Sequence, residues 1–266
     1  MHNKMAKKNP IKVVRKKPAR KPIKRKKAKS TSKNWKWISL IVLILTSCII
    51  IYYTFSEKKV MTVDTFRKSV PEGFATIGLD VSHHQGDIDW DKLMIKSGFD
   101  SIIHFVYFKA TEGNTHLDTQ WEQNRKALND LGIPNGAYHF FIPTDPPRPQ
   151  AAHFLKTWKK RDIDLAPVLD VETEGFSDKD LIAKMKIWLT EVELKTGIKP
   201  IIYTSLHFYE TKFQNDFLDY QFWIAAYSRK PQCINDKRII HWQYSESGTL
   251  PGIDELVDLN VSKLNY

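Results

Sequence analysis

The sequence predicts an α/β fold, a closed barrel of eight strands whose final third is poor in helices. From residue 76 onward, apolar strand-like runs alternate with amphipathic helical segments, which is typical of parallel strands covered by helices. Eight such runs within about 190 residues suit a barrel. The rival is an open doubly wound sheet, but GLDVSHHQGD at 78–87 lacks the GxGxxG spacing of a phosphate-binding loop.

Each element has its own signal. The fourth helix begins at an N-cap, Ser177 or Asp178, and ends at Gly197, while the third helix has prolines near its start. After the fifth strand, little sequence is left for helices between the strands. We expect helices over 88–98, 118–132, 147–160 and 178–197. We expect strands over 76–82, 101–111, 133–141, 165–173, 199–205, 221–228, 238–245 and 256–262.

The first 75 residues are organised differently. Residues 1–36 hold 16 Lys or Arg and no Asp or Glu, whereas the rest of the chain has 25 basic and 30 acidic side chains. WISLIVLILTSCIIIYYTF at 37–55 is uncharged and would span roughly 28 Å as a helix, close to the hydrocarbon thickness of a bilayer. We expect a basic cytoplasmic tail over 1–36, a transmembrane helix over 37–55, a linker over 56–75 and a catalytic barrel domain over 76–266.

The basic tail predicts orientation and partners. Lys and Arg concentrate on the cytoplasmic side of membrane spans, so the barrel domain is expected on the extracytoplasmic side of a single-pass anchor in contact with membrane lipid. This rule accounts for the charge of the tail, and nucleic acid is not expected as a partner. LTSC at 45–48 resembles a lipoprotein cleavage box, so a lipoprotein processed at Cys48 is the alternative. A cleaved signal peptide would need an unusually long basic region.

Polar side chains mark the candidate site, because the carboxyl ends of parallel barrel strands meet at one face. Carboxylates follow strands one, four and eight, and strands one and eight are neighbours in a closed barrel. We therefore expect their carboxylates to converge. The polar residues at or near strand ends are Asp80, Lys109, Glu112, Tyr138, His139, Asp170, Glu172, Tyr203, Trp223, Tyr227, Gln243, Asp258 and Asn260.

Asp170 and Glu172 suggest acid chemistry. Side chains two residues apart on a strand share a face, ~6.5–7 Å apart at the backbone, and crowded carboxyls oppose each other's ionisation. A protonated acid beside an ionised one is what glycoside hydrolysis requires. A divalent-metal site and strand-end capping without chemistry remain alternatives at this point. HExxH and GxSxG motifs do not occur in the sequence, so neither zinc nor serine catalysis is indicated.

A series of motifs resembles glycoside hydrolase family 25, the Chalaropsis-type lysozymes or N-acetylmuramidases. The match covers 76–266, in the order GLDVSHHQGDIDW, FVYFKATEG, GAYHFF, PVLDVE, KPIIYTS, FWIAAY and HWQYSESGTLPGIDELVDLNV. The resemblance implies a modified TIM-like barrel of five β/α units followed by three helix-poor strands, without a metal or other cofactor. Tyr107 and Phe108 depart from it, since smaller aliphatic residues are usual there.

The resemblance also implies the activity, cleavage of the β-1,4 bond between N-acetylmuramic acid and N-acetylglucosamine in peptidoglycan. It implies Glu172 as proton donor, with Asp170, Asp80 and Asp258 completing the acidic cluster. Asp170 would orient the substrate N-acetyl group or position water, and the sequence leaves substrate-assisted and inverting mechanisms open. The implied substrate-binding residues are Tyr138, Tyr203, Trp223, Tyr227 and Gln243. The alternative function is a non-catalytic, membrane-anchored peptidoglycan-binding module.

Overall fold

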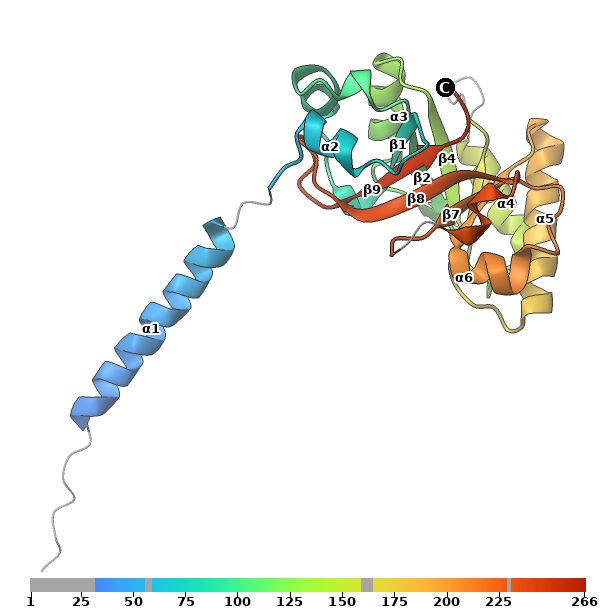
Figure 1. The fold of residues 1–266 in the computed structure, drawn as a ribbon. Coiled ribbons are helices and arrows are strands. Elements are labelled where there is room, and N and C mark those ends of the chain that lie inside the picture. The colour runs from blue at the N-terminus through green and yellow to red at the C-terminus, as the bar shows by residue number, and fades with distance from the viewer. Residues whose placement is uncertain (1–31, 56–58, 159–164, 229–230) are drawn as a thin grey trace, which may run out of the picture. The chain divides into compact units, whose positions relative to one another are not determined.

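The computed structural model describes residues 32–55, 59–158, 165–228 and 231–266 (Figure 1). It divides into two units, Met1–Glu57 and Lys58–Tyr266. The first unit contains helix α1, Ser32–Phe55, which includes the predicted span. The described side chains of this helix are exposed, and they extend no further than Cys48.

No helix in the described part of the chain is long and apolar enough to cross a membrane. Residues 1–31, most of the predicted basic tail, lie outside the described residues, as do the side chains of 49–55.

The second unit is built on a closed barrel. The strand order is β1-β9-β8-β7-β6-β5-β4-β2, and a parallel pairing of β1 with β2 closes the ring. A two-residue strand, β3 (His116–Leu117), extends β2 as a hairpin. The predicted fold class is thereby confirmed. The barrel strands are β1 (Thr76–Val81), β2 (Phe105–Glu112), β4 (Asn135–Phe140), β5 (Val168–Val171), β6 (Ile201–Ser205), β7 (Phe222–Ala225), β8 (Ile239–Gly248) and β9 (Val257–Ser262).

One strand runs against the others. β9 is antiparallel to both of its neighbours, β8 and β1, whereas the other barrel pairings are parallel. Only eight residues, 249–256, connect β8 to β9. Such a connection is too short for the crossover that a parallel pair requires. The reversal brings the amino end of β9, rather than its carboxyl end, to the face where the other strands end.

Helices cover the barrel mainly in the first two thirds of the unit. The longest, α5, has Ser177 as its N-cap, where the hydroxyl oxygen accepts from Asp180 N–H, and it ends at Gly197 in the left-handed conformation. This confirms the predicted caps. The α-helices of seven residues or more in this unit are α2 (Val63–Ser69), α3 (Trp121–Asp130), α4 (Pro147–Thr157) and α5 (Asp178–Thr196), and a π-helical turn occupies Lys92–Lys96. After β6 the described residues form only short helical segments, which are α6 (Leu206–Phe208), a π-helical turn at Tyr209–Phe213 and a 3₁₀ turn at Gln232–Asn235.

The structure corrects two expectations about the beginning of the unit. The predicted linker over 56–75 contains α2, which begins with a Thr62–Thr65 capping box and buries Phe66 completely in the core. Phe66 meets Phe99 edge to face, with ring centroids 5.5 Å apart. The strand expected from 101 begins only at Phe105, because a 3₁₀ turn occupies Phe99–Ser101.

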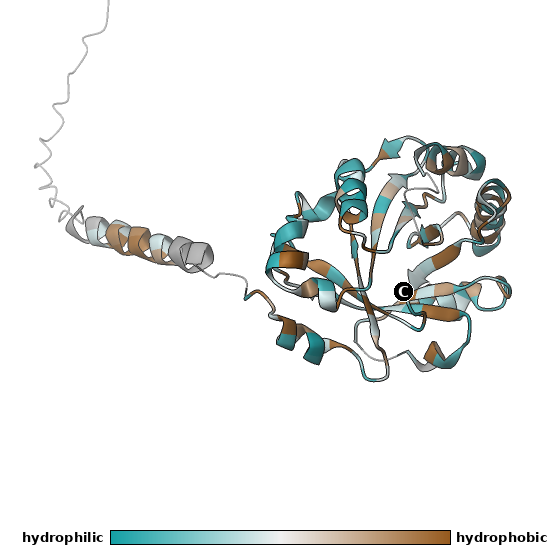
Figure 2. Cartoon of the chain, turned by 90° about the horizontal axis from the view of Figure 1, so that it is seen from above, coloured by the Kyte–Doolittle hydropathy of each residue, from teal (hydrophilic) through white to brown (hydrophobic). Residues whose placement is uncertain are grey.

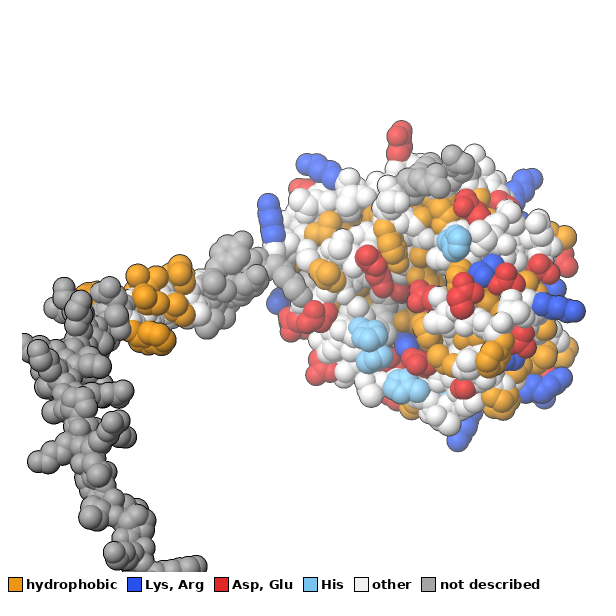
Figure 3. Space-filling view, turned by 90° about the horizontal axis from the view of Figure 1, so that it is seen from below, with side chains coloured by type: hydrophobic (Ala, Val, Ile, Leu, Met, Phe, Trp, Pro, Cys, Tyr) orange, Lys and Arg blue, Asp and Glu red, His pale blue; other side chains and the backbone are white. Residues whose placement is uncertain are grey.

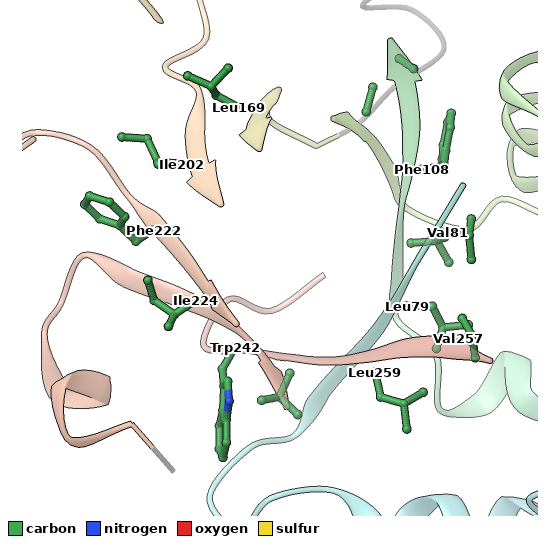
Figure 4. Packing of buried hydrophobic residues seen from close by; sticks show 14 of the residues in the cluster. Leu79, Val81, Phe108, Leu169, Ile202, Phe222, Ile224, Trp242, Val257 and Leu259 are labelled. Carbon is green, nitrogen blue, oxygen red and sulfur yellow. The ribbon is translucent and has the colours of Figure 1, made fainter. Parts of the chain in front are cut away.

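Two apolar layers lie on the two sides of the strands. The larger packs the outward-facing strand residues against the helices, and Figure 4 shows part of it, including Leu79, Phe108 and Trp242. Hydrophobic residues accordingly concentrate on the strands in Figure 2. The smaller layer fills the barrel and consists of Phe105, Tyr107, Leu165, Val168, Ile201, Tyr203, Trp223 and Ile240.

Two glycines make room for the large rings inside the barrel. A Cβ at Gly136 would lie 2.3 Å from the Tyr107 ring, and one at Gly78 would lie 2.4 Å from the Phe105 ring. Tyr107 faces inward and donates its hydroxyl to the Ala166 carbonyl at 3.2 Å. Phe108 faces outward against Trp121. Tyr107 therefore packs inside the barrel, whereas Phe108 packs in the outer core.

Candidate active site

A pocket of about 180 Å³ opens at the face where the parallel strands end. Figure 3 shows acidic and histidine side chains gathered on one face of the barrel unit. The pocket brings together residues from all eight barrel strands and from loops that follow β1 and β5. Eight of the nine predicted site residues line it: Asp80, Tyr138, Asp170, Glu172, Tyr203, Trp223, Gln243 and Asp258. The ninth, Tyr227, hydrogen-bonds to Gln243 but does not line the pocket.

Asp170 and Glu172, at the carboxyl end of β5, differ in their exposure to solvent. Asp170 lies within the strand and is buried, whereas Glu172 follows the strand end and is exposed. Asp170 Oδ1 is buried and accepts no hydrogen bond from any residue that the structure describes. Burial, followed by the charge of Glu172, raises the pKa of Asp170 well above its ordinary value.

The pKa of Glu172 is also raised. Although the side chain as a whole is exposed, its carboxyl group faces the pocket, and withdrawal from water is the largest cause of the rise. The neighbouring Tyr203 hydroxyl and the charge of Lys109 lower the pKa of Glu172 and so oppose the rise. A carboxyl with these surroundings holds a proton to higher pH than a surface glutamate, as a general acid must.

Asp80 and Asp258 meet because β9 is reversed. Asp80 is the fifth residue of β1, Asp258 is the second of β9, and the two are direct partners across the antiparallel pair. The predicted convergence is therefore found, but it arises at the amino end of the last strand. Burial raises the pKa of Asp80 to about 6. Burial and the charge of Asp80 raise the pKa of Asp258 to about 9.

Amide side chains hold Asp80. Its Oδ2 accepts from Gln243 Nε2 at 2.9 Å and from Asn260 Nδ2 at 2.7 Å. Asn260 in turn accepts from the indole N–H of Trp223 at 2.9 Å. Because Trp223 and Gln243 are almost fully buried, with exposed fractions of 1% and 2%, their polar atoms serve this network.

Three tyrosines surround the acids. Tyr203 and Tyr227 both donate their hydroxyls to Gln243 Oε1, at 2.7 and 2.6 Å. Tyr138 lines the pocket opposite them on β4, and burial keeps the pKa of its hydroxyl well above 10. All three hydroxyls are therefore protonated at neutral pH, and those of Tyr203 and Tyr227 donate to Gln243.

Lys109 lines the pocket. The sequence identifies it as a polar residue at a strand end but does not place it among the predicted catalytic or substrate-binding residues. Its ammonium is 2.6 Å from Glu112 Oε2 and lies over the Phe140 ring, 4.8 Å from the centroid. The side chain is only 6% exposed. Its charge lowers the pKa of both Asp170 and Glu172. The signal was available, since Lys109 shares the inward face of β2 with Phe105 and Tyr107.

Other polar residues were missed or lie elsewhere. Ser82, His84 and Gln85, in the turn after β1, line the pocket without having been predicted. His139 faces away from the pocket, stacked on Trp188 in the outer core. Among the described residues, no group of three or more His, Cys, Asp or Glu side chains is arranged to hold a metal ion.

Comparison with known proteins identifies relatives of the chain. The model of "Glycosyl hydrolases family 25" matches residues 79–253. YegX of Escherichia coli O6:H1 is 35% identical over 200 residues, covering 75% of this chain and 74% of that protein. The autolytic lysozyme of Clostridium acetobutylicum is 29% identical, covering 69% of this chain and 54% of the lysozyme. A family 25 glycosyl hydrolase structure from Bacillus anthracis superposes with a TM-score of 0.66 at 27% identity, covering 74% of this chain and 92% of that one.

Proposed function

The chain belongs to glycosyl hydrolase family 25, and we propose that it is a lysozyme that cleaves the β-1,4 bond between N-acetylmuramic acid and N-acetylglucosamine in peptidoglycan. The observation that carries the proposal is the convergence of four carboxyl groups, from β1, from β9 and from the end of β5, in one pocket. Relatives named as lysozymes support the choice of substrate.

Glu172 is the proton donor in this proposal. It lies at the pocket mouth, where a glycosidic oxygen can reach it, and its raised pKa favours the protonated form. When the glycosidic bond breaks, the Glu172 proton moves to the leaving oxygen and the carboxylate remains. The positive charge of Lys109, which lowers the pKa of Glu172, stabilises that carboxylate once it forms.

Asp170 acts on the other side of the bond. Its Oδ1 has no protein donor among the described residues and is available to the substrate amide or to a water molecule. In a substrate-assisted route, Asp170 accepts a hydrogen bond from the N–H of the substrate N-acetyl group. The carbonyl oxygen of that N-acetyl group then attacks the anomeric carbon. In an inverting route, Asp170 takes a proton from the attacking water. The anomeric configuration of the first product distinguishes the two.

The tyrosines form the sugar-binding wall. Tyr138 and Tyr203 line the pocket and offer their rings to the apolar sugar faces, and Tyr138 also offers a hydroxyl to a sugar oxygen, while Tyr227 supports the wall through its hydrogen bond to Gln243. Trp223 and Gln243 lie behind this wall, where they contribute shape and hold the other groups in place.

Product analysis tests the proposal. The purified full-length chain is incubated with defined peptidoglycan, and the products are examined by mass spectrometry after borohydride reduction. Reduced muramic acid at the new ends is expected. Reduced glucosamine ends would indicate a different bond specificity, whereas bound but uncut glycan would indicate a non-catalytic binding module and overturn the proposal.

We further propose that the sequence segment 37–55, of which 49–55 lie beyond the described side chains, anchors the enzyme in a membrane with the barrel unit on the extracytoplasmic side. The uncharged sequence of 37–55 and the basic residues before it support this. In fractionated cells, the intact protein is expected in the membrane fraction and its barrel unit is expected to be cleaved by protease added to spheroplasts. Recovery in the soluble fraction would overturn the anchor, and covalent lipid at Cys48 would identify a lipoprotein instead.

A further inference from the structure

Asp80 lies at the end of a chain of oriented hydrogen bonds that begins at Trp223. The indole Nε1 donates to Asn260 Oδ1, and Asn260 Nδ2 donates to Asp80 Oδ2. An indole N–H can only donate, so it fixes which end of the Asn260 amide faces Asp80. Asn260 therefore presents an N–H, and not a carbonyl, to this carboxyl oxygen.

A second chain reaches the same oxygen through Gln243. Two tyrosine hydroxyls, of Tyr203 and Tyr227, share Gln243 Oε1, and Gln243 Nε2 points at Asp80 Oδ2. The opposite orientation of the amide would place Oε1 against Asp80 Oδ2, which already accepts from Asn260. Two acceptors would then face each other, so the tyrosines select the orientation that donates to Asp80.

Both chains thus aim N–H groups at one oxygen of Asp80, and such donors favour an ionised carboxyl. Asp258, its direct partner on β9, receives no comparable pair of donors in the described hydrogen-bond network. Two carboxyls at directly paired strand positions, one buried and one half-buried, cannot both ionise readily. The proton of the pair is therefore favoured on Asp258, which can donate it to Asp80 as a hydrogen bond.

We propose that Trp223, Asn260 and Gln243 are positioning residues that make Asp80 the ionised member of the Asp80–Asp258 pair and leave Asp258 protonated. The assignment of the charge to Asp80 is independent of the proposed function, and only the role of that charge in catalysis rests on it. A fixed negative charge at Asp80 stabilises the positive charge that develops on the sugar ring, and a protonated Asp258 adds no competing charge.

The pKa values of the pair agree with this assignment. The hydrogen bonds from Asn260 and Gln243 lower the pKa of Asp80 against the effect of burial, leaving it at about 6. Burial and the neighbouring Asp80 charge raise the pKa of Asp258 to about 9.

Trp223→Phe and Gln243→Met test the proposal in the full-length chain. Gln243→Met removes one of the N–H donors to Asp80, and Trp223→Phe removes the indole N–H that orients the other donor, Asn260. Both substitutions keep much of the side-chain volume. Trp242→Phe is the matched control, because Trp242 is also buried and donates its indole N–H to a protein oxygen, Ala226 O, outside the pocket. Two readouts are followed against pH, the carbon-13 signals of the aspartate carboxyls and kcat/KM on peptidoglycan.

The Asp80 carboxyl is expected to titrate about one pH unit higher, or more, in Trp223→Phe and Gln243→Met. The acid limb of the pH profile of kcat/KM should move to higher pH by the same amount. At a fixed pH on that limb, kcat/KM should fall by about tenfold. Trp242→Phe should leave both positions unchanged. Unshifted Asp80 titration in the folded variants would overturn the proposal, as would ionisation of Asp258 before Asp80. If Trp223→Phe does not fold, Gln243→Met decides. Because the carboxyl signals need no substrate, they test this assignment even if the chain proves inactive on peptidoglycan.

Discussion

Asp80 on β1 and Asp258 on β9 are directly paired positions of two antiparallel strands. In the described barrel, β9 is the only antiparallel neighbour of β1. Like charges directly opposite on paired strands are unfavourable, and here both carboxyls also lose water. The arrangement reduces stability at pH values where both acids would ionise. Its retention at the pocket mouth is consistent with a catalytic use, since strained electrostatics concentrate at functional sites.

Asp258→Asn should stabilise the protein above neutral pH. The pKa of Asp258 is raised from an ordinary value near 4 to about 9, so the folded state binds the proton more tightly than the unfolded chain does. Stability is therefore fully present below pH 4 and is lost as the pH rises through 9. Asparagine does not titrate and can still donate to Asp80.

We expect Asp258→Asn to raise the free energy of unfolding at pH 8 by on the order of 1 kcal/mol, with a smaller gain at pH 5. Urea unfolding at the two pH values measures this. Asp219→Asn, on the exposed surface, is the control and should change neither value appreciably. A uniform loss of stability in Asp258→Asn at both pH values would refute the electrostatic explanation.

Lys109→Met should move the whole pH–activity profile upward. The Lys109 charge lowers the pKa of both Asp170 and Glu172, so its removal lets each acid hold its proton to higher pH. The limb that requires ionised Asp170 and the limb that requires protonated Glu172 then both shift in the same direction. At a pH on the limb that requires ionised Asp170, activity should fall by about tenfold if the shift is about one unit.

The measurement for Lys109→Met is kcat/KM across pH 4 to 9 on soluble peptidoglycan fragments. Lys126→Met is the matched control, because Lys126 also pairs with an acid, Asp130, but on the exposed surface of α3. A fall in rate without movement of either limb would mean that Lys109 contributes structure or binding rather than charge.

Phe66→Ala should destabilise the barrel unit. Phe66 is fully buried and packs against Phe99, so truncation removes apolar contacts and leaves a cavity, at a cost of about 3 kcal/mol. Phe176→Ala, at a position that is 81% exposed, is the control and should have little effect. Thermal unfolding of both variants measures the difference. Equal melting temperatures would mean that the segment before residue 76 behaves as the linker that the sequence suggested.

The sequence was sufficient for the barrel and for the convergence of its acids. Regular alternation of strands and helices defines the parallel part, and Asp170 and Glu172 share a face whatever the details of the loops. The Ser177 and Gly197 caps are local signals that no distant contact has to supply.

Strand direction and the segment before the barrel were harder to predict. Alternation has the same period in either direction, so the reversal of β9 leaves no trace in its own sequence. The eight-residue connection at 249–256 was the available signal, because it excludes a crossover helix. α2 has only seven residues and is stabilised by Phe66 in the core, which local sequence does not reveal.

The hydrogen-bond network depended on contacts between distant strands. The family resemblance implied that Trp223 and Gln243 bind sugar, but the structure directs their polar atoms to Asn260, Asp80 and the tyrosines. Lys109 was noticed at its strand end, yet its influence on two acids appears only when β2 and β5 are placed around one pocket.

The central claim is that Glu172 is the acid of a peptidoglycan hydrolase, and Glu172→Gln tests it most directly. The measurement is the release of reducing ends from peptidoglycan by equal amounts of folded protein. Glu174→Gln is the matched control, since Glu174 is two residues away, exposed and paired with Lys212 at 3.0 Å. We expect Glu172→Gln to lose at least a hundredfold in rate, as loss of a general acid implies, while Glu174→Gln stays within about threefold of the unmodified enzyme. Comparable activity in the two variants would contradict the account.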